Sequence, residues 1–115
     1  MAIQTQTMRN ALVDAYKTQA AAVALFSTAP GVSPGTELTG GAPAYARKAA
    51  NWGGTASSAA TAAPAAFDVA SGSTVAGVGL YTSTTAGTYL DGASVTSQSF
   101  SSQGTYTVTA TYTQS

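Results

Sequence analysis

The chain has 115 residues, which is room for one domain with one modest hydrophobic core. Only 7% of the residues are charged and the formal net charge is zero, whereas about a quarter are charged in an ordinary soluble domain, and four basic residues at zero net charge argue against a nucleic-acid partner. Cysteine and histidine are both absent, which excludes a disulfide framework, a thiolate metal site and the Ser-His-Asp and Cys-His catalytic arrangements.

The N-terminal part, residues 1–20, predicts an arm followed by one helix. Residues 1–7 are polar and without period, and from Met8 onward apolar residues recur at helical spacing through Leu12 and Ala15/Tyr16. Thr7 is the expected N-cap, and the helix is expected to end near residues 18–20 after about three turns. This narrow row of apolar residues on one side of the helix suits packing on the chain's own sheet and packing on a neighbouring subunit equally well. In the second case the interface residues are Met8, Arg9, Leu12 and Tyr16.

The longest apolar run, Ala20–Phe26, follows the helix directly. It is far shorter than the ~20 residues that span a bilayer, so no membrane partner is expected. Asp14 and a long polar lead precede the run, which is the wrong layout for a secretory signal. We therefore expect an unprocessed chain made in the cytoplasm.

Residues 21–115 predict a mainly β fold, a compact antiparallel β-sandwich of about seven short strands. Turn residues bound the strands at 71–73, at Asp91-Gly92 and at Gln103-Gly104, and residues 53–63 read as a loop. Gly77 and Gly79 within one strand indicate a bulge or a close backbone approach. The expected strands are Val23–Ser27, Tyr45–Trp52, Ala65–Val69, Val75–Tyr81, Thr88–Leu90, Val95–Phe100 and Thr105–Thr113.

The last of these segments, Thr105–Thr113, alternates strictly with a period of two. Threonines fall on one face and Tyr, Val and Ala on the other, as in a strand with one apolar face. It carries no charge and no proline, which are two of the usual guards of an exposed sheet edge. We therefore expect both of its edges to be covered, by this chain or by another copy.

Side chains for catalysis are few. The four carboxylates, Asp14, Glu37, Asp68 and Asp91, lie on different elements, and no spacing points to a catalytic pair, a metal site or a cofactor, so we expect no enzymatic activity. Residues 31–43 form a long loop rich in glycine and proline, and Glu37 and Arg47 flank it and are expected to pair across its base. The aromatic residues are most simply interpreted as core, with an exposed platform for a sugar or a nucleic acid as the alternative.

Three segments carry a resemblance to a known family: Val23–Gly31, Gly35–Gly41 and Tyr45–Ala49. They resemble small virion proteins of tailed bacteriophages, of the kind labelled minor tail or tail-fibre-like proteins. The likeness continues more weakly through Phe67 and Val75–Tyr81 and covers roughly residues 8–90, but not the segment beyond Asp91. It implies a short helix leading into a compact β-domain used in virion structure.

The sequence and the resemblance together favour a non-enzymatic structural protein on the exterior of a tailed-phage virion. Because the chain is short and shows no long coiled coil or distal adhesive domain, the expected role is a capsid decoration protein that docks on the major capsid lattice as a small homo-oligomer. Its near-zero charge suits an interface that is repeated many times. The alternatives are a minor tail, tail-fibre or baseplate protein, and a carbohydrate-binding module that recognises the host surface through exposed Tyr and Trp.

Overall fold

The computed structural model describes residues 4–114, as one helix followed by eight antiparallel strands. The helix is α1 (Gln6–Gln19). The strands are β1 (Ala22–Phe26), β2 (Lys48–Ala49), β3 (Ala59–Thr61), β4 (Ala65–Val69), β5 (Thr74–Tyr81), β6 (Tyr89–Ser99), β7 (Gly104–Val108) and β8 (Thr111–Thr113). The predicted class, mainly β with a short N-terminal helix, is confirmed.

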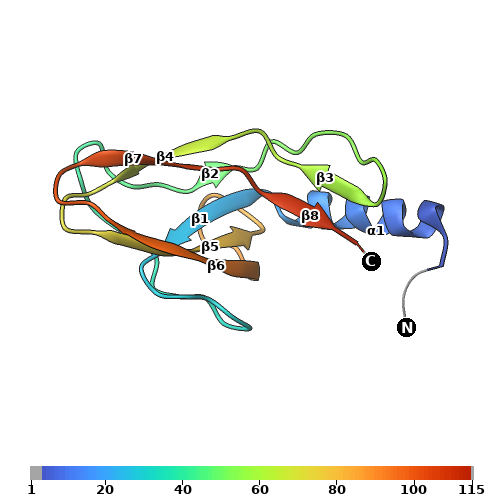
Figure 1. The fold of residues 1–115 in the computed structure, drawn as a ribbon, viewed down its shortest axis with the longest axis horizontal. Helices are drawn as coiled ribbons and strands as arrows, with labels where there is room; N and C mark the ends of the chain where they lie inside the picture. Colours follow the sequence, from blue (N-terminus) through green and yellow to red (C-terminus); the bar gives the residue numbers. More distant parts are fainter. Residues whose placement is uncertain (1–3, 115) are drawn as a thin grey trace.

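The strands lie in two layers along an elongated molecule of 48 × 24 × 23 Å (Figure 1). One layer is a four-stranded sheet in the order β2-β1-β5-β6. The pair β4-β7 lies across from it, and the pair β3-β8 continues at the end of the molecule where α1 lies. The chain thus forms a sandwich with one wide sheet and one narrow one.

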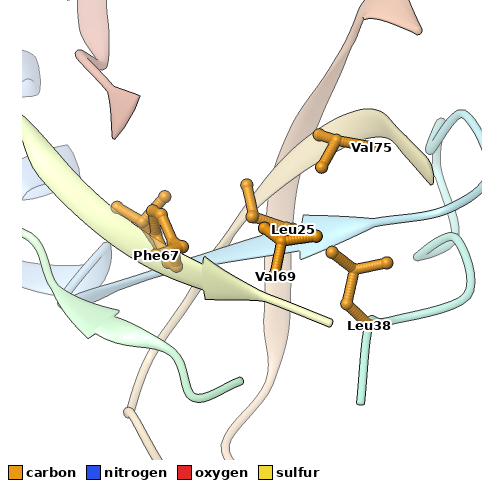
Figure 2. Packing of buried hydrophobic residues seen from close by; sticks show 6 residues of the cluster. Leu25, Leu38, Phe67, Val69 and Val75 are labelled. Carbon is orange, nitrogen blue, oxygen red and sulfur yellow. The ribbon is translucent and has the colours of Figure 1, made fainter. Parts of the chain in front are cut away.

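The main core lies between the two layers. Leu25 of β1, Phe67 and Val69 of β4, and Val75 of β5 are completely buried, and Leu38 covers one end of the cluster (Figure 2). These side chains alternate with exposed or half-buried residues along β4 and β5, as expected for strands with one face toward a core. At about 25 cal/mol per Å² of apolar surface, burial of these residues is the largest stabilising contribution to the fold.

Strand β1 is buried on both faces, which explains its uninterrupted apolar sequence. Val23 and Leu25 point into the main core, whereas Ala22, Ala24 and Phe26 belong to a second cluster on the outer face of the sheet. Tyr81 and Tyr89 complete that second cluster, and their rings pack edge-on or tilted against Phe26 at 6.4 and 6.1 Å between centroids. The wide sheet is therefore covered on both sides at its centre.

The loop that follows β1 folds back over this outer face through glycine positions. The Pro30 ring rests on Gly77 and Gly92, where an added Cβ would overlap it, and a Cβ at Gly79 would overlap the Phe26 ring. The Tyr89 hydroxyl donates to the Gly31 carbonyl at 2.7 Å. The close backbone approach predicted at Gly77 and Gly79 is confirmed, and the β5-β6 pairing also has a bulge next to Gly77.

Several element boundaries differ from the prediction. The helix begins at Gln6 and is capped by Thr5, whose hydroxyl accepts from the Met8 N–H at 3.3 Å, so Thr7 is not the N-cap. Of the predicted arm, residues 1–3 lie outside the described residues. Of the predicted strand at 45–52, Lys48–Ala49 forms β2 and Trp52 makes an isolated bridge with Ala62. Tyr45 and Arg47 bond to Glu37 instead. The predicted loop 53–63 contains β3, which pairs with β8.

The C-terminal third differs most. Asp91-Gly92 is not a turn, because it lies within the continuous strand β6, where Gly79 is opposite Gly92. Conversely, the single strand predicted at 105–113 is divided, since β7 pairs with β4 and β8 pairs with β3. The predicted alternation of faces does hold, with the threonines exposed and Tyr106, Val108 and Tyr112 half-buried.

Candidate functional site: the helix face, the clasp and the open cleft

Helix α1 packs on the β-domain through one narrow face. Val13 is its one fully buried residue, and Tyr16 and Lys17 on the same side are half-buried. The Lys17 ammonium donates to the Gly53 carbonyl and to the Thr55 hydroxyl, each at 2.9 Å. The helix is thus attached mainly to the segment that leads into β3.

Arg9 also lies on the inward side of the helix. Its Nε donates to the Ser58 hydroxyl at 2.8 Å, and the Ser58 N–H donates to the Asn10 carboxamide at 3.0 Å. Ser58 is the one buried polar residue among those described. Arg9 therefore has a role in attaching the helix to its own chain.

Tyr16 joins the helix to both layers. Its hydroxyl donates to the Asp91 carboxylate of β6 at 2.8 Å, and its ring stacks on Tyr112 of β8 with 3.7 Å between centroids and 10° between planes. Trp52 meets the Tyr16 ring edge-on at 6.0 Å. Burial, reinforced by the hydrogen bond to Asp91, raises the pKa of the Tyr16 phenol, so it remains a neutral donor.

The opposite side of α1 faces solvent and is apolar. Met8 is 51% exposed and Leu12 is 38% exposed, and Ala11 and Ala15 beside them are also exposed. We call these four residues the α1 stripe. The structure therefore divides the predicted interface set, because Met8 and Leu12 lie on the stripe while Arg9 and Tyr16 contact their own chain.

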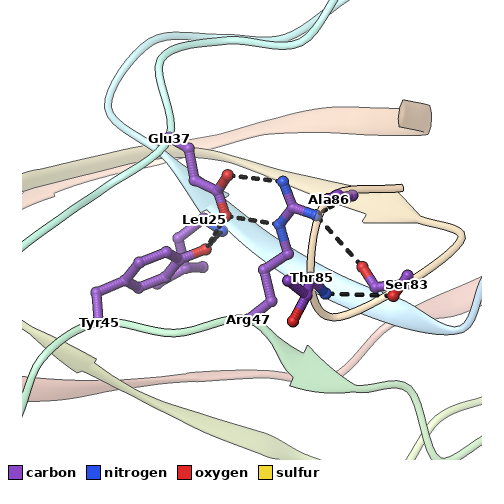
Figure 3. A network of polar contacts seen from close by, with 7 residues as sticks. All are labelled: Leu25, Glu37, Tyr45, Arg47, Ser83, Thr85 and Ala86. Carbon is purple, nitrogen blue, oxygen red and sulfur yellow. Dashed lines mark hydrogen bonds and ion pairs between the residues drawn. The ribbon is translucent and has the colours of Figure 1, made fainter. Parts of the chain in front are cut away.

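Glu37 and Arg47 form a two-pronged ion pair at the base of the long loop (Figure 3). Arg47 Nε donates to Glu37 Oε2 at 2.8 Å and its Nη2 donates to Oε1 at 2.9 Å. Nη1 donates to the carbonyls of Ser83 and Ala86 in the β5–β6 loop. The guanidinium also lies over the Tyr81 ring, 3.7 Å from its centroid. We call this arrangement the clasp.

Tyr45 connects the clasp to the buried strand β1. Its hydroxyl donates to Glu37 Oε2 at 2.8 Å and accepts the Leu25 N–H at 2.9 Å. Burial alone would raise the pKa of Glu37, but the hydrogen bonds from Arg47 and Tyr45 outweigh it and hold that pKa below its usual value. All these contacts fix the relative positions of segments that are distant in sequence, which is a structural role.

An open cleft lies between the layers, where the free edges of β6 and β7 face each other. Its volume is about 360 Å³, and Asp91 and Tyr16 line it beside a mainly apolar wall. The wall includes Val78, Leu80, Ala93, Val95, Tyr106 and Val108. The cleft can accept apolar side chains, and its one carboxylate is already bonded to Tyr16.

The remaining predicted features are placed as follows. The Trp52 indole N–H donates to the Ala20 carbonyl at 2.8 Å, so this ring is anchored on its own chain. Within residues 4–114 no helix is long and apolar enough to cross a membrane, and no three acidic side chains gather as a metal site would require. Tyr45, Tyr81 and Asp91 were not predicted as site residues. No sequence signal marks them, since their partners come from other elements.

Comparison with protein-family models, with curated proteins and with solved structures finds no match to this chain.

Proposed function

We propose that this chain is a non-enzymatic structural protein that docks on other proteins on the exterior of a tailed-phage virion, as a capsid decoration protein. The observation that supports the proposal most directly is the α1 stripe. A helix that packs with Val13 and Tyr16 inward would ordinarily place polar residues outward, but here the outward side presents Met8 and Leu12.

Charge supports the same reading. The α1 stripe has no charged member, and the chain's zero net charge gives no long-range repulsion between copies placed side by side. A single contact through the four residues of the α1 stripe would be weak. Many such contacts on a repeated lattice bind more strongly together, through avidity. The family resemblance of residues 8–90 supplies the virion context.

The experiment uses particles of the phage that encodes the chain, produced with either the wild-type chain or Leu12→Asp. We expect the variant to fold normally and to be missing from purified particles, because Leu12 is exposed in the free chain and covered in the docked one. Thr18→Asp, on the exposed polar side of α1, is the matched control and should be incorporated. Incorporation of Leu12→Asp at the wild-type level would refute docking through the stripe.

Copy number distinguishes decoration from a tail role. Quantitative gels of intact particles should give hundreds of copies for a decoration protein and a handful for a minor tail, tail-fibre or baseplate protein. The carbohydrate-binding alternative relies on exposed aromatic rings, and here Tyr16, Tyr81 and Trp52 all have contacts within the chain. Retention of the purified chain on immobilised host cell wall would favour that alternative over docking.

A further inference from the structure

The C-terminal segment Gly104–Thr113, which we call the C-terminal edge, is paired along one side. β7 pairs with β4 and β8 pairs with β3, and between them the Ala62 N–H donates to the Ala110 carbonyl at 2.8 Å. Within residues 4–114, no strand pairs with its other side. One of its two edges is thus covered by this chain, and the other is open.

The backbone of the C-terminal edge directs hydrogen-bonding groups toward that open side. Successive residues of a strand point their N–H and C=O groups to opposite sides. The Ala110 carbonyl and the Gln114 N–H both bond to the segment containing β3, at 2.8 Å each. The odd-numbered residues, among them Thr107 and Thr109, therefore point these groups away from β3 and β4.

The open side lacks the devices that normally block an added strand. It has no charged residue, no proline and no bulge in its regular register with β4. The other edge beside the cleft, that of β6, carries Asp91 and has two irregularities in its pairing with β5. Of the two free edges beside the cleft, the C-terminal edge is therefore the one that can accept an added strand.

The narrow layer is also one strand short at this position. The inward-facing Ala93 and Val95 of β6 line the cleft because no strand of the opposite layer covers them. A strand added beside β7 would extend the narrow layer at the mouth of the cleft. A strand with apolar residues at every second position suits this place, because its apolar face would continue that of β7.

The C-terminal edge has that pattern itself, and its sequence is almost a palindrome. We propose that the open side pairs antiparallel with the same edge of a second copy, about a twofold axis at Thr109. Each Tyr, Val and Ala of the added strand then points to the same side as its opposite residue, toward the cleft. The opposed residues are Thr109 with Thr109, Thr107 with Thr111, Thr105 with Thr113, Tyr106 with Tyr112, and Val108 with Ala110.

The two copies of the C-terminal edge complement each other in side-chain type and in charge. Threonine meets threonine on the outer face, where their hydroxyls can bond as those of Thr61 and Thr111 already do at 3.2 Å. No charges are brought together. A single pair of short edges is a small interface of the weak class, so the copies should associate reversibly. The proposal does not depend on the virion assignment.

The first test is sedimentation velocity of the purified full chain from about 10 µM to 1 mM, a range that detects weak pairs. We expect a monomer–dimer equilibrium. Thr109→Lys places two like charges opposite each other at the axis and should weaken the dimer about tenfold or more. The matched control is Thr96→Lys, an exposed threonine on β6, which should leave the equilibrium unchanged.

The second test uses the absence of cysteine in the chain. Thr109→Cys introduces one thiol at the axis, where the opposed Cα atoms would be about 5.5 Å apart, within the range that a disulfide spans, so mild oxidation should produce a covalent dimer. Thr96→Cys should not. Circular dichroism melting checks that each variant is folded. A monomer at all concentrations, or a dimer lost in Thr96→Lys and retained in Thr109→Lys, would overturn the proposal.

Discussion

Replacing Arg47 with methionine tests whether the clasp stabilises the fold. The substitution keeps much of the apolar stem and removes the guanidinium, and with it the two bonds to Glu37, the bonds to Ser83 and Ala86, and the contact with the Tyr81 ring. Glu37 keeps its hydrogen bond from Tyr45 but loses its counter-charge. The β5–β6 loop loses its two hydrogen bonds from the segment that leads into β2.

The expected loss follows from how far the pair is removed from water. The Arg47 side chain is 13% exposed and that of Glu37 is 26% exposed. An exposed ion pair contributes about 0–1 kcal/mol, and breaking a buried one costs about 3–5 kcal/mol. This pair lies between those limits, and we expect Arg47→Met to lower the free energy of unfolding by about 2–3 kcal/mol.

Urea unfolding, followed by tyrosine and tryptophan fluorescence, measures the loss. With a slope of about 1–3 kcal/mol per molar urea for a small domain, a loss of about 2–3 kcal/mol should lower the midpoint by about 0.7–3 M. Arg47→Lys keeps the charge but not the two-pronged geometry. Its urea midpoint should therefore lie between those of the wild type and Arg47→Met. The neighbouring Lys48→Met is the control, expected within about 0.5 kcal/mol of wild type. If Arg47→Met matches Lys48→Met, the clasp does not stabilise the fold.

Four further outcomes are expected. Because the pKa of Glu37 is below its ordinary value of 4.5, its contribution is present above that pH and is lost as the pH falls through the lowered pKa, so the stability of Glu37→Gln should depend less on pH than that of wild type below pH 4.5, as measured by acid unfolding. Phe67→Ala should cost about 3–5 kcal/mol in urea unfolding, since the ring is fully buried in the main core. Gly79→Val should destabilise by about 1–3 kcal/mol or more, because its side chain would displace the Phe26 ring, and a melting temperature equal to wild type would contradict that packing. Val13→Asp should detach α1, seen as a lower melting temperature and lost helical circular dichroism, whereas Leu12→Asp should change neither.

The sequence predicted well those elements whose pattern is decided locally. Strand β4 was predicted at its observed bounds, and β1 and β5 within one residue at either end, because apolar runs bounded by turn residues are strong signals. The alternation of faces at 105–113 was also predicted. The division of that segment was not, since it depends on two different partner strands, β3 and β4.

The errors occur where tertiary contacts outweigh local preference. Asp91-Gly92 has a turn sequence, yet its glycine lies under the Pro30 ring and its carboxylate accepts from Tyr16, and both contacts require an extended strand. Strand β3 consists of alanine and threonine and has no apolar pattern to reveal it. Periodicity also could not tell which side of α1 is buried, because the apolar Met8 and Leu12 are exposed while the covered side combines Val13 with polar residues such as Lys17.

The loop between β1 and Glu37 has a practical consequence for protein engineering. Its two arms meet at the base, where the Ser27 N–H donates to the Thr36 carbonyl at 2.7 Å, and Pro30 holds it against the wide sheet. At its tip Val32 is fully exposed. A foreign peptide inserted beside Val32 would begin and end on a fixed platform and touch neither the clasp nor the C-terminal edge. If the chain coats a particle, this loop is the natural position for displaying an epitope in many copies.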